Sequence, residues 1–169
     1  MRILLVHSDF LEFEAKQRTP LAEDVPSEQR SGRLEEVLVV FTAAEEEDGS
    51  NIEGVSKNAA REISEVARKV EAKRVAIYPY AHLSSSLASP KAAIKLLDAT
   101  AGALREFGIE VHRLPFGWYK AFKLSCKGHP LSELSRTITA EAVEAEARAP
   151  EAVPSKRIIL TPDGGEHEL

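Results

Sequence analysis

Two amphipathic helices, each followed by a short apolar strand, constrain the fold of this chain more than any other feature. The first helix is predicted over residues 52–70, where apolar side chains recur every three or four positions. The second begins after the capping residue Ser89, has Pro90 in its first turn and ends at Gly108. Its buried face is predicted to comprise Ala93, Ile94, Leu97, Ala101, Leu104 and Phe107. The strands that follow the two helices are predicted at residues 74–78 and 110–114.

Three further strands complete the predicted sheet. Residues 3–6 and 35–41 are rich in Leu, Ile and Val, so both are predicted to be buried strands. Between them, residues 17–33 contain two prolines and a glycine, which is typical of a polar loop or a loose hairpin. Residues 119–125 form the last clear strand. The sequence therefore predicts a mixed α/β (α+β) domain: a mixed sheet of about five or six strands with two long helices packed on it.

The length of 169 residues suits one compact core, which we place at residues 1–138. Ala, Glu and Pro dominate residues 139–154, so this stretch is predicted to be an acidic linker that is partly helical at most. Residues 155–161 are expected to form a strand at the start of a following segment. Residues 139–169 thus look appended to the core, and the chain looks cut from a longer protein.

Composition and charge exclude several classes of protein. No run of about 18 apolar residues exists, so no membrane span is expected, and the apolar N-terminus is too short for a signal peptide. The only cysteine, Cys126, excludes an internal disulfide and suits the cytoplasm. The net charge of −5 argues against indiscriminate nucleic-acid binding. However, residues 113–136 carry five basic side chains against one acidic side chain, so contact with phosphate is expected there.

The stretch most informative about chemistry is residues 115–130, which holds the only tryptophan and interleaves aromatic with basic side chains. Alternate side chains of a strand share one face, so Lys120 is predicted to point the same way as Phe122 and Leu124. Burying a lysine on an apolar face is unfavourable. Either its ammonium reaches water at the strand end, or the lysine is retained for a chemical purpose. The same stretch also fits a stacking platform for single-stranded nucleic acid.

A second candidate site lies in residues 78–86, between a predicted strand and a predicted helix. His82 lies there at the C-terminal end of a strand, where α/β sheets bind ligands, and it can transfer a proton or orient a substrate. A histidine bonded to a loop carbonyl is the simpler alternative. The three serines at residues 84–86 lack a Gly-x-Ser-x-Gly context and are predicted to be loop and capping residues. Two weaker hypotheses are a metal site from His7, His82, His112 and His129, and a catalytic pair of Cys126 and His129.

Four motifs resemble the N-terminal editing domain of archaeal threonyl-tRNA synthetases. They occupy residues 1–9, 78–85, 115–123 and 125–136 and read MRILLVHSD, YPYAHLSS, PFGWYKAFK and SCKGHPLSELSR. Because these motifs are long and ordered, the chain is similar to that family over roughly residues 1–138. The resemblance implies a fold similar to D-aminoacyl-tRNA deacylases. It also implies hydrolytic removal of L-serine from seryl-tRNA(Thr), with threonyl-tRNA(Thr) spared.

Site residues and partners follow from the same resemblance. The implied catalytic residues are Lys120, His82, Tyr119 and Glu133. The implied binding residues for the terminal adenosine are Pro79, Tyr80, Ala81 and Phe116. The expected partners are the acceptor end of tRNA(Thr), a second copy in a homodimer, and a synthetase core in cis or in trans. Editing is expected to need no cofactor, since ATP and zinc would belong to that core. The alternatives are a D-aminoacyl-tRNA deacylase and a non-catalytic tRNA-binding appendage.

Overall fold

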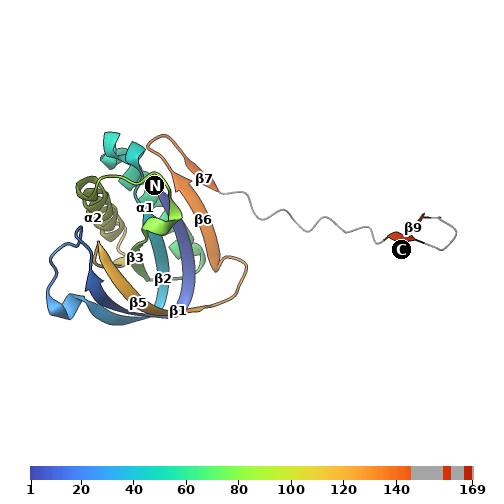
Figure 1. Ribbon diagram of the computed structural model, residues 1–169, viewed down its shortest axis with the longest axis horizontal. Coiled ribbons are helices and arrows are strands. Elements are labelled where there is room, and N and C mark those ends of the chain that lie inside the picture. The colour runs from blue at the N-terminus through green and yellow to red at the C-terminus, as the bar shows by residue number, and fades with distance from the viewer. Residues whose placement is uncertain (146–157, 161–165, 169) are drawn as a thin grey trace.

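A mixed, curled seven-stranded sheet with two helices packed on it makes up the body of the protein (Figure 1). The computed structural model describes residues 1–145, 158–160 and 166–168. The strands are β1 (Arg2–Arg18), β2 (Ser31–Ala43), β3 (Arg74–Pro79), β4 (Glu110–Arg113), β5 (Trp118–Cys126), β6 (Glu133–Ile138), β7 (Val143–Ala145), β8 (Ile158–Leu160) and β9 (Glu166–Glu168). The helices are α1 (Ile52–Lys69), α2 (Pro90–Glu106) and the 3-10 turns η1 (Ser27–Gln29), η2 (Glu46–Ser50) and η3 (Ala81–Leu83). The fold class predicted from the sequence is confirmed.

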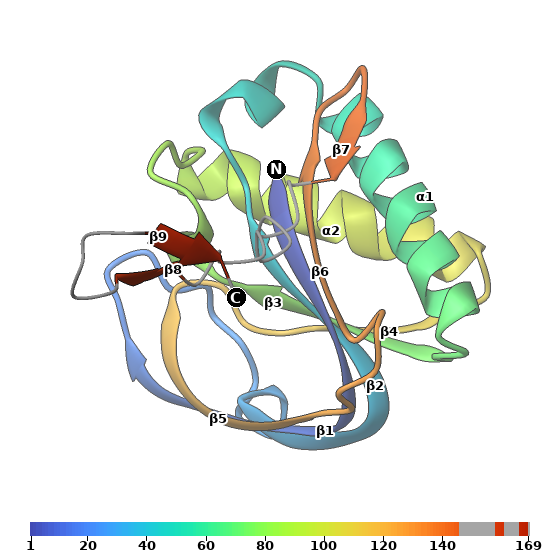
Figure 2. The ribbon, with the colours of Figure 1, turned by 90° about the vertical axis from the view of Figure 1, so that its right-hand side faces the viewer.

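The strand order is β4-β3-β2-β1-β6-β7, with β5 also paired to β1. Strands β2, β3 and β4 are parallel and are connected by the two helices, whereas β1 is antiparallel to β2. The 17-residue β1 has two partners on its other edge: Arg2–Val6 pairs with β6, and Ser8–Arg18 pairs with β5. Register shifts interrupt the β1–β5 pairing at two points. Such irregularities bend and twist strands, and here the sheet curls so that β5 sweeps away from β6 (Figure 2).

Alternation along β1 sorts its side chains between the two faces of the sheet. Ile3 and Leu5 are buried against the helices, in a core shared with α1 and α2. Leu4 and Val6 belong to a second, smaller core on the other face. Full burial of one such side chain stabilises the fold by ~1.5–3 kcal/mol. The first core fixes the helices on the sheet, and the second, rich in aromatic rings, forms the wall of the site described below.

Both long helices begin as predicted. The side chain of Asn51 accepts a hydrogen bond from Gly54 N–H at the start of α1, and Ser89 does the same for Ala92 N–H at the start of α2. Two residues of the predicted buried face are wrong: Ile94 is only partly buried, with Leu96 buried instead, and Phe107 is 57% exposed. Phe107 is the C-cap of α2, where the chain leaves helical geometry, and so it no longer shares the buried face.

The C-terminal half of the sheet was under-predicted. Strand β6 pairs with β1 and was missed, because its sequence mixes polar with apolar residues and has no continuous apolar run. Strand β7 pairs with β6, so the sheet continues into the predicted linker as far as Ala145. Residues 146–157 of that linker lie outside the described residues. The strand predicted within residues 155–161 is present as β8, which pairs with β9. None of the described helices is long and apolar enough to cross a membrane.

Candidate active site

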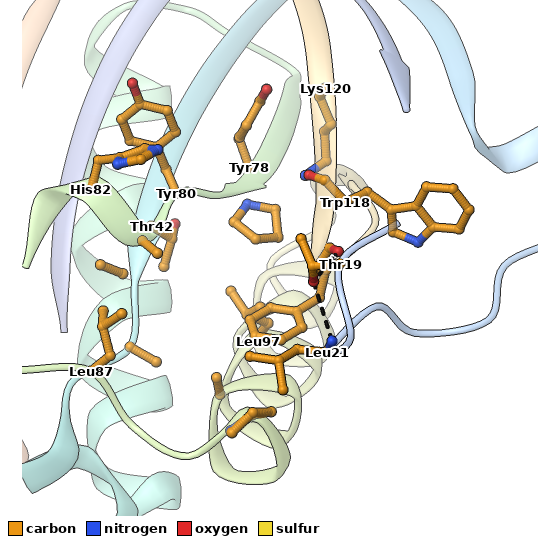
Figure 3. A pocket seen from close by; sticks show the side chains of 18 of the residues that line it. Thr19, Leu21, Thr42, Tyr78, Tyr80, His82, Leu87, Leu97, Trp118 and Lys120 are labelled. Atoms are coloured by element: carbon orange, nitrogen blue, oxygen red, sulfur yellow. Dashed lines mark hydrogen bonds between the residues drawn. The ribbon is translucent and has the colours of Figure 1, made fainter. Parts of the chain in front are cut away.

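A cavity of about 930 Å³ opens at the C-terminal end of β3 (Figure 3). Five segments line it: residues 19–21, 42–44, 78–82, 87–97 in part, and 116–122 in part. Its walls are largely hydrophobic side chains with a few polar groups between them, which is typical of pockets that bind small organic groups. The cavity lies where the parallel strands β2 and β3 end together, the edge at which α/β sheets commonly bind ligands.

Lys120 faces this cavity from β5, as the alternation of the strand predicted. Its Nζ donates a hydrogen bond to the carbonyl oxygen of Trp118 at 3.3 Å and lies 5.0 Å from the ring centroid of Tyr78. Burial is the main reason that the pKa of Lys120 is lowered to about 8; the carboxylate of Glu23 opposes this shift, and the guanidinium of Arg113 adds to it to a smaller extent. The ammonium is therefore still the main form at neutral pH, but it is far easier to deprotonate than an exposed lysine.

An aromatic cluster forms the wall beside Lys120. The Tyr78 ring centroid lies 5.0 Å from that of Phe41 and 5.4 Å from that of Phe122, and Tyr80 packs 5.2 Å from Phe41. Burial, and to a smaller extent Tyr80, raises the pKa of Tyr78 to about 12. The Tyr78 phenol is therefore uncharged at physiological pH, and its ring offers Lys120 the electron-rich face that a cation prefers.

His82 is exposed at the rim of the cavity, in the turn η3, and its ring packs edge-to-face on Tyr80 at 5.1 Å between centroids. The turn is held by Ser84, whose hydroxyl donates to Glu45 Oε2 at 2.7 Å and accepts from Ser86 N–H. Ser84 is thus a loop residue with a structural hydrogen bond, as predicted. His82 is presented to the cavity by a turn anchored at one end on the aromatic cluster and at the other on Glu45.

The structure brings together seven of the eight site residues expected from the sequence. His82, Tyr119 and Lys120 line the cavity, together with Pro79, Tyr80, Ala81 and Phe116. Tyr119 is 63% exposed and lies at the mouth. Glu133 does not line the cavity: it begins β6, is paired with Val6 and is exposed. Its catalytic role stays a prediction.

Two alternatives from the sequence are also placed by the structure. The Nδ1 of His129 accepts from Leu131 N–H at 3.1 Å, and its Nε2 lies 2.7 Å from His7 Nδ1. Both ring nitrogens of His129 are thus used, which leaves neither to activate Cys126. His112 lies 2.9 Å from Glu110 on β4, and His82 is in η3. No set of three or more metal-binding side chains occurs among the residues that the structure describes.

Sequence reasoning missed the wall formed by the loop between β1 and β2. Thr19, Pro20 and Leu21 line the cavity on the side opposite His82 (Figure 3). The sequence indicated only a polar loop there, since nothing local shows that it docks on residues about a hundred positions further along the chain. A partial signal in the sequence was the glycine at position 117. Gly117 has a φ of 78°, which residues with a side chain rarely adopt.

A large hydrophobic cavity that holds a half-buried lysine, with an imidazole at its rim, is typical of a ligand-binding or catalytic domain. Comparison with known proteins narrows this class. Residues 1–138 match the family described as the archaea-specific editing domain of threonyl-tRNA synthetase, and the chain belongs to this family.

Full-length relatives support the assignment. The chain is 52% identical over 163 residues to a threonine–tRNA ligase of Methanobrevibacter smithii, covering 96% of the chain and 26% of that protein. It is 50% identical over 163 residues to that of Methanocaldococcus jannaschii, covering 96% of the chain and 25% of that protein. It is 48% identical over 185 residues to that of Methanosarcina mazei, covering all of the chain and 29% of that protein. The chain therefore spans between a quarter and a third of the length of these relatives.

Proposed function

We propose that this chain hydrolyses the ester bond of seryl-tRNA(Thr) in the cavity beside Lys120 and spares threonyl-tRNA(Thr). The observation that carries this proposal is the cavity itself. In a chain of the editing-domain family, it gathers a desolvated ammonium, an imidazole and a hydrophobic wall at one strand end. Its volume of about 930 Å³ has room for an aminoacylated nucleoside. The acceptor end of tRNA(Thr) is then the partner, and a synthetase core works with it in cis or in trans.

The need for such a site follows from the chemistry of the two amino acids. Threonine is serine with one extra methyl group, and a pocket made for threonine rejects serine by only about 1–3 kcal/mol. A second site that destroys seryl-tRNA(Thr) supplies the missing discrimination. Steric exclusion works well in that direction, because the extra methyl group of threonine collides with a closely fitted wall or displaces the attacking water.

The reaction needs modest catalytic help because an aminoacyl ester is already activated. Water adds to the ester carbonyl carbon, the bond from that carbon to the ribose oxygen breaks, and the ribose oxygen leaves with a proton. In this proposal the Lys120 ammonium donates a hydrogen bond to the carbonyl oxygen as negative charge develops there. His82 orients the terminal ribose, whose vicinal hydroxyl shares in the proton transfer. Tyr119 shapes the mouth of the pocket.

The adenine ring of the terminal nucleotide is proposed to lie against Tyr80 and Phe116, with backbone contacts at Pro79 and Ala81. A stacked aromatic contact of this kind contributes ~1–3 kcal/mol to binding, and it does not depend on the nucleotide sequence beyond the terminal adenosine. Replacing Phe116 with Leu is therefore expected to raise KM for the charged tRNA while kcat changes little.

Glu133 requires a separate proposal, because it lies outside the cavity lining of a single chain. We propose that the protein is a homodimer and that Glu133 acts at the assembled site. Sedimentation of the purified chain measures the dimer, and Glu133→Ala is expected to reduce seryl ester hydrolysis without changing the unfolding midpoint. A monomeric chain with full activity would remove this proposal.

The test is deacylation of tRNA(Thr) charged separately with L-serine, L-threonine and a D-amino acid. The expected result is rapid loss of L-serine, no acceleration for L-threonine, and an activity at least about 100-fold lower in Lys120→Met. The matched control is Lys123→Met, an exposed lysine on the same strand that does not line the cavity. Loss of only the D-amino acid would make the chain a chirality-checking deacylase. Binding of tRNA without any hydrolysis would make it a binding appendage.

A further inference from the structure

The loop after β1 docks on the turn that leads into β5. Four hydrogen bonds hold it there: Thr19 N–H and Thr19 Oγ1 donate to Gly117 O at 3.0 and 2.7 Å, Glu23 N–H donates to Phe116 O at 3.1 Å, and Trp118 Nε1–H donates to Glu23 O at 3.0 Å. All four join the loop to a three-residue segment, residues 116–118. The loop is therefore held at one defined position on this segment and does not simply lie on the surface.

The side chain of Glu23, which does not line the cavity, strengthens this contact. Its Oε1 accepts from Phe116 N–H at 2.7 Å, and its two carboxylate oxygens accept from the two Nη groups of Arg113. The side chains are only 17% and 14% exposed. Arg113 is fixed in turn by Asp98 of α2, 2.9 Å from its Nε. A paired carboxylate and guanidinium of this geometry form one of the strongest polar contacts available to a protein.

Glu23 is held in its negatively charged form. Burial by itself would raise the pKa of Glu23, but hydrogen bonds from Arg113 and from Phe116 N–H outweigh burial and hold the pKa below its ordinary value. A negative charge is therefore held close enough to Lys120 to raise its pKa.

The backbone on the other side of the contact is adapted to it. Gly117 has a φ of 78°, and a Cβ at this position would lie 2.6 Å from Ala22 Cα and from Leu21 O. Contacts this short do not occur, so only glycine permits the approach of the loop. Glu23 and Gly117 thus fix the same contact by two independent means, one attractive and one steric.

Two consequences for the cavity follow. The docked loop supplies Thr19, Pro20 and Leu21 to the wall opposite His82, and Leu21 is 57% exposed (Figure 3). In addition, the Glu23 carboxylate raises the pKa of Lys120 through its charge. Glu23 also accepts hydrogen bonds from Phe116 and Trp118, next to the Trp118 carbonyl that accepts from Lys120 Nζ.

We propose that Glu23 is a positioning residue of the editing site. It holds residues 19–25 against the turn before β5, a contact that we call the latch. The latch sets both the wall that excludes threonine and the position of the Lys120 ammonium. The inference rests on the proposed hydrolysis of seryl-tRNA(Thr). Glu23 itself does not line the cavity and does not touch the substrate.

The charged and titratable groups around Lys120 give the latch a readout that a purely structural role lacks. They are Glu23 from the loop, Arg113 from β4 and the Tyr78 phenol from β3. Glu23 raises the pKa of Lys120, so removing its carboxylate while the loop stays docked is expected to lower that pKa further. A variant that is merely less stable but still folded would keep the wild-type pKa of Lys120. A shift of this pKa therefore reports on the charge of Glu23.

The experiment compares Glu23→Gln with Glu28→Gln, an exposed glutamate in the same loop. For seryl-tRNA(Thr), Glu23→Gln is expected to reduce kcat about 10–100-fold, to lower the pH at which activity declines, and to release threonine from threonyl-tRNA(Thr) faster than wild type. Glu28→Gln is expected to stay within about twofold of wild type. Unchanged kcat, pH midpoint and selectivity in Glu23→Gln would overturn the proposal.

A second variant separates the wall from the charge. Gly117→Ala leaves Glu23 and Lys120 chemically intact but pushes the loop away, and it is expected to lose discrimination against threonine while the pH midpoint moves less than in Glu23→Gln. If Gly117→Ala discriminates as well as wild type, the wall assignment is wrong.

Failure of the proposed function can be told from failure of the latch. Wild-type protein that releases no serine rejects the function. In that case NMR titration of the Lys120 side chain in wild type and Glu23→Gln still tests the coupling: a lower lysine pKa in the variant supports the latch, and an unchanged pKa rejects it.

Discussion

At the scale of single residues, the protein holds two ionisable side chains where their charged forms are disfavoured. Lys120 faces a hydrophobic cavity, and its ammonium has Trp118 O as a hydrogen-bond partner and the Tyr78 ring as a neighbour. His7 is 6% exposed and shares its Nδ1 with His129. Both pKa values are lowered, chiefly by burial. Such groups reduce the stability of the fold in a pH range that can be stated in advance.

Replacing Lys120 with Met is expected to stabilise the protein at pH 7 although it lowers the proposed editing activity. The folded-state pKa of about 8 lies below the ordinary value of 10.5, so the unfolded chain binds this proton more tightly than the folded chain does. The resulting loss of stability is complete below pH 8 and disappears above the ordinary value. The urea midpoint of Lys120→Met should therefore exceed that of wild type at pH 7, and the difference should shrink by pH 10. A lower midpoint at both pH values would show that the lysine stabilises the fold.

The His7–His129 pair is expected to make the fold sensitive to mild acid. Since His129 Nδ1 accepts from Leu131 N–H, its Nε2 carries the proton and donates to His7, so protonation of His7 removes the acceptor. The His7 pKa is lowered by burial first, then by His129 and Lys127, so stability is lost as pH falls below about 6.5. Between pH 7.5 and 5 the unfolding free energy of His7→Gln should change less than that of wild type. The control His82→Gln, at an exposed histidine in the turn η3, should follow wild type.

At the scale of elements, the site depends on how α2 and β1 begin and end. The first turn of α2 contributes Pro90 and Ala93 to the cavity, and the Ser89 side chain caps that turn. The strand β1 is long enough to reach from the N-terminus to the docked loop, and its change of partner from β6 to β5 carries Lys120 over the end of β3. Neither element forms the site alone, but each fixes one wall of it.

Removing the cap of α2 is expected to affect both stability and binding. Ser89→Ala should lower the unfolding free energy by about 1 kcal/mol, and Ser89→Gly by only a few tenths, since glycine is tolerated at an N-cap. Because the first turn lines the cavity, Ser89→Ala should also raise KM for seryl-tRNA(Thr) more than it lowers kcat. Equal unfolding midpoints for Ser89→Ala and wild type, measured in urea, would mean that the cap contributes nothing.

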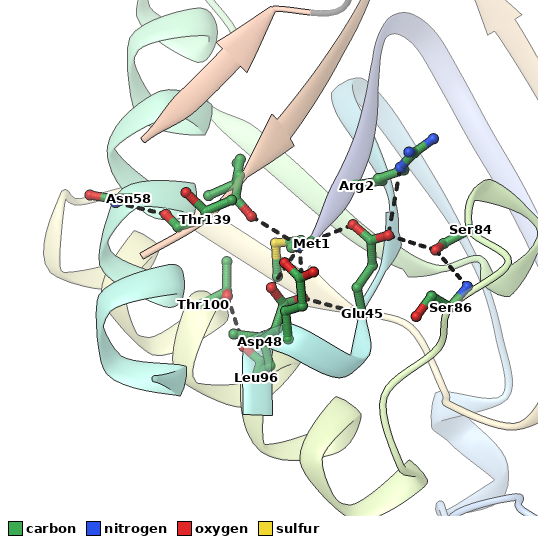
Figure 4. Close-up of polar contacts among 12 residues, drawn as sticks. Met1, Arg2, Glu45, Asp48, Asn58, Ser84, Ser86, Leu96, Thr100 and Thr139 are labelled. Atoms are coloured by element: carbon green, nitrogen blue, oxygen red, sulfur yellow. Dashed lines mark hydrogen bonds and ion pairs between the residues drawn. The ribbon is translucent and has the colours of Figure 1, made fainter. Parts of the chain in front are cut away.

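At the scale of the whole molecule, the amino group of Met1 connects distant parts of the fold (Figure 4). That ammonium lies 2.8 and 2.7 Å from the two carboxylate oxygens of Asp48, 3.4 Å from Glu45, and donates to Ile138 O at 3.0 Å. It therefore joins β1, the segment around η2 and the end of β6. Through Ser84, Glu45 extends the network to the turn that carries His82.

Breaking this ion pair is expected to destabilise the whole domain and not one element. The side chains of Met1 and Asp48 are 0% and 5% exposed, and removing one partner of such a buried pair typically costs about 3–5 kcal/mol. Asp48→Asn should therefore shift the single urea transition to a much lower midpoint. Asp24→Asn, which removes a 90% exposed partner of Arg18, should change the unfolding free energy by less than about 1 kcal/mol. A small effect of Asp48→Asn would mean that Glu45 replaces it.

The parts of the fold predicted from the sequence are those with a local cause. Helices α1 and α2, the cap Ser89, and the direction of Lys120 follow from periodicity, capping and strand alternation, all of which act over a few residues. The motifs of the site also lie on two short stretches of sequence, so seven of its eight expected residues line one cavity.

Other features of the fold and the site were decided only by the tertiary structure, because they depend on contacts between distant positions. Strand β6 is a strand because β1 pairs with it, since its own residues show no clear pattern. Glu133 lies outside the cavity for the same reason: its register against Val6 places it, and no local signal specifies that register. The Glu23–Arg113 pair joins residues 90 positions apart, and local periodicity carries no information at that separation. The sequence by itself therefore determined the helices, the class of fold and the face of β5 on which Lys120 lies. Only the folded chain decided which loop closes the site, because that choice belongs to long-range packing.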